Sequence, residues 1–492
     1  MKRREFVGAG LALASAWPFR GWSAVLKNVG DVAAKSLEGA DITLRGSSIE
    51  ALSAGLSGDL LMPGQQRYEQ ARLIWNGMFD KRPALIARCT GAADVMQAVN
   101  FAREHRLLTA VRAGGHSFSG KSTCDGGLMI DLEPMTGVRV DPKARRAYLD
   151  TGSRLQLLDH ETQAFGLATT AGTVSDTGAA GLTLGGGLGR LGRRFGLSCD
   201  NVVGADVVTA AGSLVHANES ENADLLWGLR GGGGNFGVVT SLEYRLHPVD
   251  PIVLAGEVAW PFDQARDVLR YVFEFGERMP DELSLEPTLV WTPDGKPLIS
   301  VEACWSADHA SGEKLLAPLR RIGKPINDSI APMPYVALQS SADAGLPAGN
   351  NYYAKSGFMP KLDEADIDLI LATFLEAPTK FIMFMESYGG AYGRVPVEAT
   401  AFPNRKEKFF LLIVSQWKGN EDDARHLSDL RGSWKRIDHL ARGFYTNLAD
   451  PDTTAAVIHD NYGPNFPRLS ALKAKYDPMN LFRLNANVPP KV

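Results

Sequence analysis

The sequence is poor in cysteine and has no dominant charge. Its 492 residues include four cysteines, with no Cys-x-x-Cys pair and no histidine beside them at metal-ligand spacing. Lysine and arginine number 52 against 56 aspartates and glutamates, a net charge of −4 without any basic block. The composition therefore predicts no metal site and buried free thiols, and it excludes a polybasic nucleic-acid or membrane contact.

Long hydrophobic runs are also missing, since no stretch approaches the about 20 apolar residues of a membrane-spanning helix. Residues 1–24 begin with Lys-Arg-Arg at 2–4 and continue with a short apolar run at 6–16. This pattern predicts an export signal of the twin-arginine type, which carries folded proteins to the periplasm or outside the cell. A general secretory signal and a retained anchor are the alternatives.

Glycine is the residue in excess, with 51 copies gathered in clusters. Residues 112–120 read Arg-Ala-Gly-Gly-His-Ser-Phe-Ser-Gly and follow a short apolar strand at 107–111. Glycines take positive φ and let backbone N–H groups approach a flat ring or a phosphate. The turn either presents His116 to a flavin as its covalent attachment point or is an ordinary turn with a surface histidine.

A second cluster begins at residues 172–178, Gly-Thr-Val-Ser-Asp-Thr-Gly. Its glycines and hydroxyl groups are typical of a pyrophosphate cradle. The later run at 185–189, Gly-Gly-Gly-Leu-Gly, does not match the Gly-x-Gly-x-x-Gly fingerprint of dinucleotide-binding folds. A Rossmann domain is therefore not expected.

Hydrophobic periodicity predicts a mixed architecture, and the chain length and 45% hydrophobic content allow two or three domains. Helices are expected at 92–105, 223–229 and 365–375, and strands at 107–111, 128–132, 137–140, 147–150, 238–246, 298–304 and 409–417. This alternation predicts an α+β protein.

The ordered motifs along the chain resemble a known family. Trp-Asn-Gly at 75–77, Gly-Gly-His-Ser at 114–117, the glycine run at 181–187 and Gly-Gly-Asn-Phe-Gly-Val-Val-Thr at 233–240 occur in sequence. The ending Asn-Leu-Phe-Arg-Leu-Asn-Ala-Asn at 480–487 continues the series. From about residue 65 onward the chain resembles the vanillyl-alcohol oxidase and p-cresol methylhydroxylase (PCMH) superfamily, and within it the berberine-bridge-enzyme-like oxidases.

The resemblance implies an α+β fold with a two-subdomain PCMH-type FAD-binding domain. A substrate domain follows, with an antiparallel sheet flanked by helices. The expected boundaries are an export signal at 1–24, the FAD domain at 65–250, the substrate domain at 251–450, and a C-terminal segment at 451–492 that returns to the FAD domain.

The resemblance also implies FAD held by a single covalent link through His116. Relatives that carry a second link use a cysteine where this chain has Val174. The other cofactor-binding residues implied are Arg112, Ala113, Gly114, Gly115, Ser117, Gly120, Thr173, Ser175, Asp176, Thr177, Gly178, Gly181, Leu184, Gly185, Gly186, Gly189, Asn201, Gly237, Val238, Val239, Tyr445, Asn485 and Asn487.

Catalysis of C–H oxidation requires a base for the heteroatom proton. The family pattern implies Tyr445 for this role, although a packed tyrosine with a bonded hydroxyl is the alternative. Further catalytic candidates are Glu386 and Gln416, and the expected pocket residues are Tyr388, Tyr392 and Trp417, which could equally be sheet packing.

Three functions follow from the sequence. The first is an exported oxidase that moves a hydride from an alcohol, sugar or secondary-metabolite C–H to FAD and then reduces dioxygen to hydrogen peroxide. The second is an FAD-dependent dehydrogenase with another acceptor. The third is a flavin-binding envelope protein without turnover. The expected partners are a small-molecule substrate and dioxygen, with no nucleic acid, and the chain is a monomer or homo-oligomer.

Overall fold

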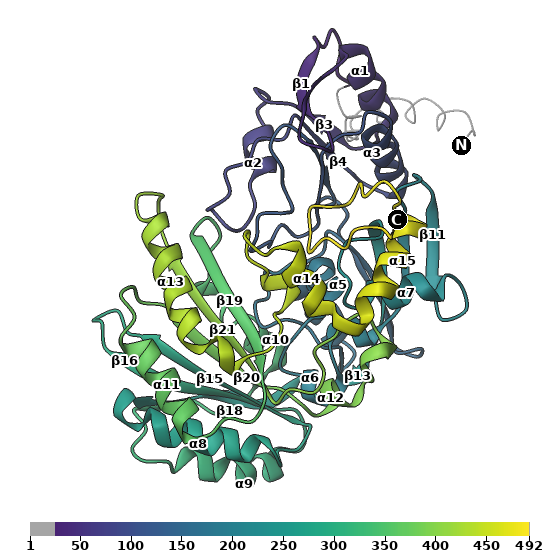
Figure 1. The fold of residues 1–492 in the computed structure, drawn as a ribbon. Coiled ribbons are helices and arrows are strands. Elements are labelled where there is room, and N and C mark those ends of the chain that lie inside the picture. The colour runs from purple at the N-terminus through teal and green to yellow at the C-terminus, as the bar shows by residue number, and fades with distance from the viewer. Residues whose placement is uncertain (1–24, 492) are drawn as a thin grey trace, which may run out of the picture.

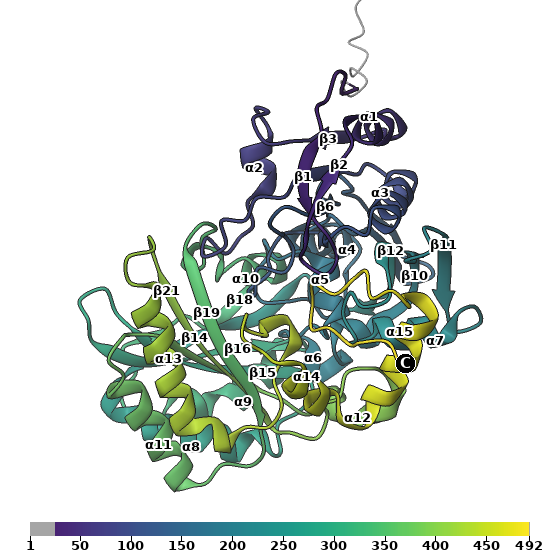
Figure 2. The ribbon, with the colours of Figure 1, turned by 45° about the horizontal axis from the view of Figure 1, so that its top comes forward.

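A computed structural model describes residues 25–491 of the chain. The predicted export signal at 1–24 lies outside the described residues. Within residues 25–491, no helix is both long and apolar enough to cross a membrane. A small N-terminal unit comes first, formed by β1 (Val32–Lys35), β2 (Asp41–Leu44) and α1 (Gly46–Gly55), and Figure 2 shows it at the top of the molecule.

A four-stranded sheet carries the histidine turn. Its order is β3 (Asp59–Leu61), β4 (Leu85–Arg88), β6 (Leu128–Asp131) and β5 (Thr109–Arg112). β6 runs parallel to both β4 and β5, and the helix α3 (Ala92–Glu104) makes the crossover between β4 and β5. Parallel strands buried by such crossovers are continuous apolar runs, as Leu85, Ile86 and Ala87 illustrate. The turn at 113–120 therefore leaves the end of a rigid buried strand.

A five-stranded antiparallel sheet lies beside it. Its order is β11 (Leu214–Asn218), β10 (Val202–Val208), β12 (Val238–Arg245), β8 (Arg146–Asp150) and β7 (Val138–Asp141). Between β8 and β10 the chain forms α4 (Leu155–Gln163), the cradle loop, α5 (Ala179–Leu184) and α6 (Gly192–Phe195). The second and third glycine clusters thus sit in the loops that connect this sheet.

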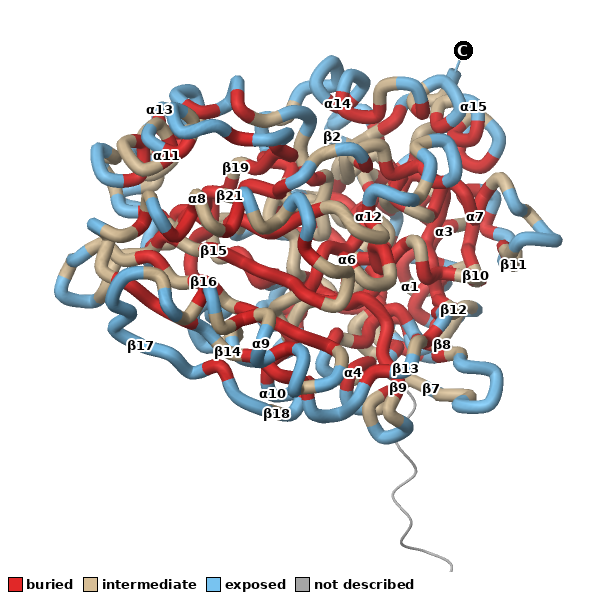
Figure 3. The backbone as a smooth tube through the Cα atoms, turned by 90° about the horizontal axis from the view of Figure 1, so that it is seen from below, coloured by how far each residue is buried: buried red, intermediate tan, exposed pale blue. Residues whose placement is uncertain are grey.

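The largest element is an eight-stranded antiparallel sheet at the lower left of Figure 1. Its order is β17 (Asn327–Asp328), β14 (Ile252–Pro261), β16 (Pro297–Trp305), β15 (Leu283–Trp291), β20 (Ile382–Ser387), β21 (Phe409–Trp417) and β19 (Asn351–Met359), with β18 (Ala331–Pro334) also paired to β14. Most of its backbone is buried (Figure 3).

The two faces of this sheet have different partners. One face packs on α8 (Ala265–Gly276), α9 (His309–Arg320), α11 (Glu364–Leu375) and α13 (Asp423–Ile437), through a core that includes Leu285, Val301 and Ile413. Alternate residues of the same strands, such as Glu286, Glu302 and Leu412, face the cavity described below. The helices therefore leave the second face free to line a site.

The C-terminal segment returns to the first half of the chain. The helix α15 (Phe466–Tyr476) packs against α7 (Ala223–Leu229) at the right of Figure 1, and α14 (Ala455–Tyr462) precedes it nearer the centre of the view. The buried Lys473 ammonium group donates to the Asp477 carboxylate at 2.7 Å and to the carbonyls of Asn235 and Phe482 at 2.7 and 2.9 Å. One buried cation thus joins the third glycine cluster to the chain ending.

The expected elements are confirmed. α7 and β21 have the predicted bounds, and α3, α11, β12 and β16 differ from the predicted bounds by one residue at an end or ends. The strand expected at 107–111 instead forms β5 at 109–112. The four cysteines are buried free thiols, as predicted. The α+β class is also correct.

Replacing Lys473 by methionine should destabilise the protein strongly. Removing one partner of a buried ion pair leaves an uncompensated charge and costs about 3–5 kcal/mol. Lys475, two residues along α15, forms an exposed pair with Asp224, and Lys475→Met should cost at most about 1 kcal/mol. Denaturant unfolding of the two variants measures the difference; equal losses would contradict this account.

Candidate functional site

One large cavity of about 1320 Å³ lies between the glycine loops and the free face of the eight-stranded sheet. Its walls come from the histidine turn, the cradle loop, the C-terminal segment and strands β14, β15, β16, β20 and β21. Single small-molecule sites typically occupy about 300–1,000 Å³. The cavity therefore has room for a large cofactor together with a substrate.

His116 is held by a stack of aromatic rings on one side of the cavity. The Trp75 indole lies 4.0 Å from the imidazole centroid, at 19°, and the Tyr352 ring stacks on the same indole at 3.9 Å. Trp75 Nε1 donates to the Leu346 carbonyl at 3.1 Å, which fixes the indole. The stack thus holds the imidazole in one orientation.

The His116 ring is neutral and one of its nitrogens is free. Nε2 is buried and has no hydrogen-bond partner among residues 25–491. Burial lowers the pKa of His116 to about 4, with Arg154 adding to the effect. A neutral, unpartnered imidazole nitrogen facing a cavity is available as a nucleophile or ligand.

The backbone of the same turn offers unused donors. The N–H groups of residues 114–117 donate to no acceptor in the described part of the chain. The backbone at Gly114 also passes close to Gly178, in the glycine-rich loop at 172–178. A Cβ on Gly114 would lie 2.2 Å from the Gly178 Cα. Glycine is required at this crossing, and the cavity wall presents N–H groups suited to an acceptor-rich ligand.

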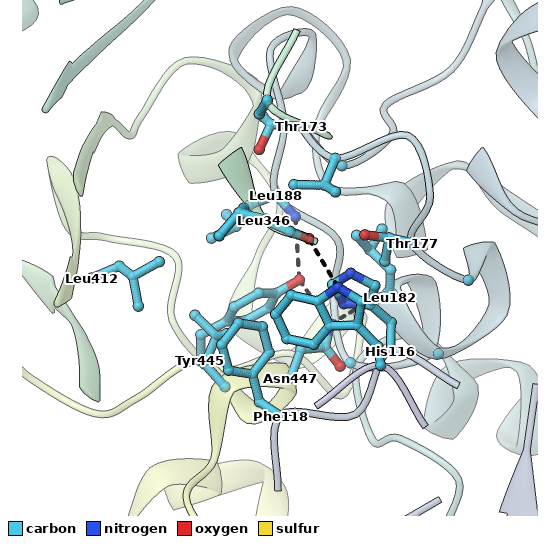
Figure 4. A pocket seen from close by; sticks show the side chains of 18 of the residues that line it. His116, Phe118, Thr173, Thr177, Leu182, Leu188, Leu346, Leu412, Tyr445 and Asn447 are labelled. Carbon is cyan, nitrogen blue, oxygen red and sulfur yellow. Dashed lines mark hydrogen bonds between the residues drawn. The ribbon is translucent and has the colours of Figure 1, made fainter. Parts of the chain in front are cut away.

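Tyr445, from the C-terminal part of the chain, also lines the cavity (Figure 4). Its Oη accepts hydrogen bonds from the N–H of Gly187 at 2.9 Å, from Leu188 at 3.4 Å and from Asn447 Nδ2 at 2.8 Å. Burial raises the pKa of Tyr445 to about 12, although these donors act in the opposite direction. The phenol is protonated at neutral pH, and its own proton has no acceptor among the described residues.

Glu386 supplies a buried carboxyl group to the same cavity. It lines the cavity from β20 and is fully buried, and the Tyr392 hydroxyl lies 2.9 Å from its Oε1. Burial raises the pKa of Glu386 to about 7. Across the sheet, Glu386 pairs with Phe410 of the neighbouring strand β21. The Phe410 ring centroid lies 5.8 Å from that of Tyr445. An acid–base group and a hydroxyl donor thus both neighbour Phe410.

Comparison with known proteins decides the family. Residues 83–218 match a family model described as an FAD binding domain, and residues 444–489 match one described as berberine and berberine like. An FAD-linked oxidoreductase of Dictyostelium discoideum is 33% identical over 441 residues, covering 88% of this chain and 95% of that protein. The chain belongs to the FAD-linked oxidoreductases. It is an FAD-dependent enzyme of the vanillyl-alcohol oxidase and PCMH superfamily, in its berberine-like branch.

Other relatives of this oxidoreductase have named activities. The (R)-6-hydroxynicotine oxidase of Paenarthrobacter nicotinovorans is 30% identical over 470 residues, covering 90% of this chain and 99% of that protein. A crystal structure of 6-hydroxy-D-nicotine oxidase from Arthrobacter nicotinovorans covers 89% of this chain and 98% of its own, with 27% identity and a TM-score of 0.82. A solved chitooligosaccharide oxidase covers 91% and 100%, with 26% identity and a TM-score of 0.81.

The cavity of the oxidoreductase fits FAD. The unused N–H groups at 114–117 match the many acceptor atoms of a flavin and a pyrophosphate, and the carboxamide oxygen of Asn485 is buried at the wall without a partner. The predicted cofactor residues that line the cavity are Ala113, Gly114, Gly115, His116, Ser117, Thr173, Thr177, Gly178, Gly181, Leu184, Gly185, Gly237, Val238, Val239, Tyr445 and Asn485. Most of the predicted cofactor set is thus brought together.

The remaining predicted cofactor residues do not line the cavity. They are Arg112, Gly120, Ser175, Asp176, Gly186, Gly189, Asn201 and Asn487. Their other contacts explain this: Arg112 pairs with Asp131, and Asp176 pairs with Arg154. Ser175 donates both its N–H and its hydroxyl to the Asp343 carboxylate, at 2.8 and 2.6 Å.

Glycines and asparagines of this set also have structural roles. A Cβ at Gly120 would meet the Phe79 ring at 2.3 Å, and one at Gly189 would meet the Ala171 carbonyl at 1.8 Å. Gly186 has a φ of 128° and packs against Phe402. Asn201 donates to the carbonyls of Phe195 and Leu197. These residues shape the loops rather than face the cavity.

Four of the predicted catalytic and pocket residues also lie off the wall. Gln416 is on the cavity face of β21 but two residues beyond Val414, where the wall ends. Trp417 faces the helices, stacks on His426 and donates to Asp423 at 2.6 Å. Tyr388 and Tyr392 stack on each other behind the wall, with ring centroids 4.4 Å apart. Of the pocket set, Tyr392 still contacts the site through Glu386.

Several wall residues were missed by the sequence analysis. Glu286, Glu302 and Arg190 line the cavity, as do Leu412 and Val414. Arg190 is buried and donates to both carboxylate oxygens of Glu302, at 2.5 and 3.1 Å. A glutamate inside an otherwise apolar strand was the available signal for Glu286, because buried glutamates are rare unless paired.

The pH dependence of stability should report the buried state of His116. Because the pKa falls on folding from 6.5 to about 4, the unfolded chain binds more protons between these pH values. The free energy of unfolding of the flavin-free protein should therefore rise with pH across this window, by roughly 2–3 kcal/mol from this residue. Denaturant unfolding at both ends of the window tests this, and His116→Gln should lose that part of the slope.

Proposed function

We propose that the protein is an oxidase: His116 would hold FAD, which would supply the hydride acceptor for oxidation of a substrate C–H, with dioxygen as the final acceptor and hydrogen peroxide as the product. The observation that carries this proposal is the unpartnered Nε2 of His116 in a cavity larger than a cofactor alone requires. When bound, FAD supplies the hydride acceptor. The oxidase names of two relatives support the choice of acceptor.

The link is proposed to be single. Val174, at the place of the second attachment in relatives, lines the cavity. None of the cysteines at 89, 124, 199 and 304 lines the cavity, and all are buried elsewhere. No thiol is therefore placed to form a second bond.

The part of the cavity that the cofactor would leave free is called the substrate space. There, Glu386 is proposed as the general base and Tyr445 as a hydrogen-bond donor. A base is most effective when its pKa lies near the working pH, which fits the pKa of about 7 at Glu386. Tyr445, with its pKa raised to about 12, keeps its proton and directs it to the cavity. This assignment replaces the role of base that the family resemblance implied for Tyr445.

The domain boundaries and the export of the protein are proposed as well. Residues 65–250 with 451–492 would form the FAD-binding unit and 251–450 the substrate unit. Residues 1–24 would direct export by the twin-arginine route. N-terminal sequencing of the protein from the periplasm tests the export, and an uncleaved chain in the cytoplasm would refute it.

Covalent attachment can be tested by acid precipitation of the purified protein. The protein should be yellow, and its flavin fluorescence should stay in the pellet. In His116→Ala the flavin should be released to the supernatant, because no second link exists. His105→Ala is a matched control that should keep the flavin. A flavin freely released from the parent protein would contradict the linkage.

The base is tested by anaerobic stopped-flow reduction of the flavin. The reduction rate should rise with pH through about 7, as the Glu386 carboxyl loses its proton. Glu386→Gln should slow reduction about 10²-fold or more and abolish this rise, since a general base contributes about 10²–10⁴-fold. Tyr445→Phe should slow reduction less and keep the pH profile. The reverse pattern would return the role of base to Tyr445.

A further inference from the structure

Four glutamates form a continuous row across the sheet that roofs the cavity. Glu257 on β14 pairs with Glu302 on β16, and Glu302 pairs with Glu286 on β15. Glu386 on β20 continues the row, because Phe384 of that strand pairs with Thr288, two residues from Glu286. All four side chains line the cavity. We call these four residues the glutamate row.

The rest of the roof becomes apolar away from this row. The next register row holds Ser300, Thr288 and Phe384, which pair across β16, β15 and β20. The row after that holds Leu298, Val290, Ile382 and Val414, and it reaches Trp75 beside His116. The roof is therefore amphipathic, with carboxyl groups at one side and aliphatic side chains at the other.

Within the described chain only one member of the glutamate row forms an ion pair, although Arg190 and Arg193 both lie within electrostatic reach of the row. Arg190 neutralises Glu302 through two hydrogen bonds. No described lysine or arginine forms an ion pair with Glu286 or Glu386, which are 4% and 2% exposed. The contact of Glu286 within the described chain is a 3.5 Å hydrogen bond from Ser284 Oγ to Oε1, so its second oxygen is unpartnered in the cavity.

This imbalance has an energetic consequence. An unpaired buried carboxylate costs several kcal/mol, and the group avoids the cost by taking up a proton. Burial, together with the neighbouring Glu302 and Glu386, raises the pKa of Glu286 well above its ordinary value, although the nearby Arg190 guanidinium acts in the opposite direction. A cation bound beside Glu286 would remove this penalty, whereas a neutral hydroxyl compound would not.

We infer that the substrate space is selective for amphiphilic ammonium compounds, with the cationic nitrogen at the glutamate row and the apolar body against the aliphatic side of the roof. This inference rests on the proposed function, because the cavity beside the cofactor is taken as the substrate site. Glu286 is its specificity-determining residue. Glu257, at the exposed end of the row, guides the cation from solvent.

Calorimetric titration of the flavin-loaded protein with benzylamine and benzyl alcohol tests the inference. The two probes have the same number of heavy atoms, and near neutral pH they differ by one positive charge. Benzylamine should bind about tenfold tighter or more, equivalent to about 1.4 kcal/mol. In Glu286→Gln the ratio of the two dissociation constants should fall toward one.

Two further variants control the experiment. Glu274→Gln, on the exposed outer side of α8, should leave the ratio unchanged. Glu257→Gln should lower it moderately, and this variant serves if Glu286→Gln does not fold. Equal affinities in the parent protein, a ratio unaffected by both row variants, or no binding of benzylamine would overturn the inference.

Failure of the ammonium selectivity and failure of the proposed oxidase function give different experimental results. A yellow protein whose flavin is reduced by substrates, but which binds both probes equally, would overturn the ammonium selectivity alone. A colourless protein that takes up no FAD and still prefers benzylamine would overturn the oxidase function, while the charge selectivity of the glutamate row would stand.

Discussion

The site depends on one buried guanidinium group. Arg190 leaves the second glycine cluster and donates to Glu302 on the eight-stranded sheet, to Gln339 at 3.0 Å and to Ser341 at 3.3 Å. A bidentate pair of this kind fixes direction as well as distance. The roof of the cavity is thereby held in register with the loops that form its floor. A lysine in this place would keep the charge and lose the geometry.

The same arrangement explains why acidic groups can remain in so buried a place. A row of four carboxyls would repel itself if every member were charged, and Arg190 forms an ion pair with one of them while it and Arg193 partly offset the charge of the others. Burial raises the pKa of both Glu286 and Glu386, so these two carboxyls can take up protons instead of remaining as unpaired charges. The roof thus has a chemical state that depends on what occupies the cavity.

Local sequence signals predicted the elements but not the contacts between distant ones. The bounds of β21 and the placement of His116 follow from periodicity and from one glycine-rich turn. The hydrogen bond between Ser175 and Asp343 joins residues 168 positions apart, and no local sequence pattern predicts it. The glutamate row is similar: each member looks isolated in its own strand, and it is the strand register that aligns them.

The return of the chain ending to the cavity constrains how the protein is made. Phe482, Leu484 and Asn485 form part of the wall, and Lys473 ties this segment to the third glycine cluster. Domains generally begin to fold from the N-terminus during synthesis, yet part of the cavity wall is missing until residues 482–485 have been synthesised. The complete cavity therefore forms only after most of the rest of the chain has folded, and a chain truncated before residue 482 would have an open cavity.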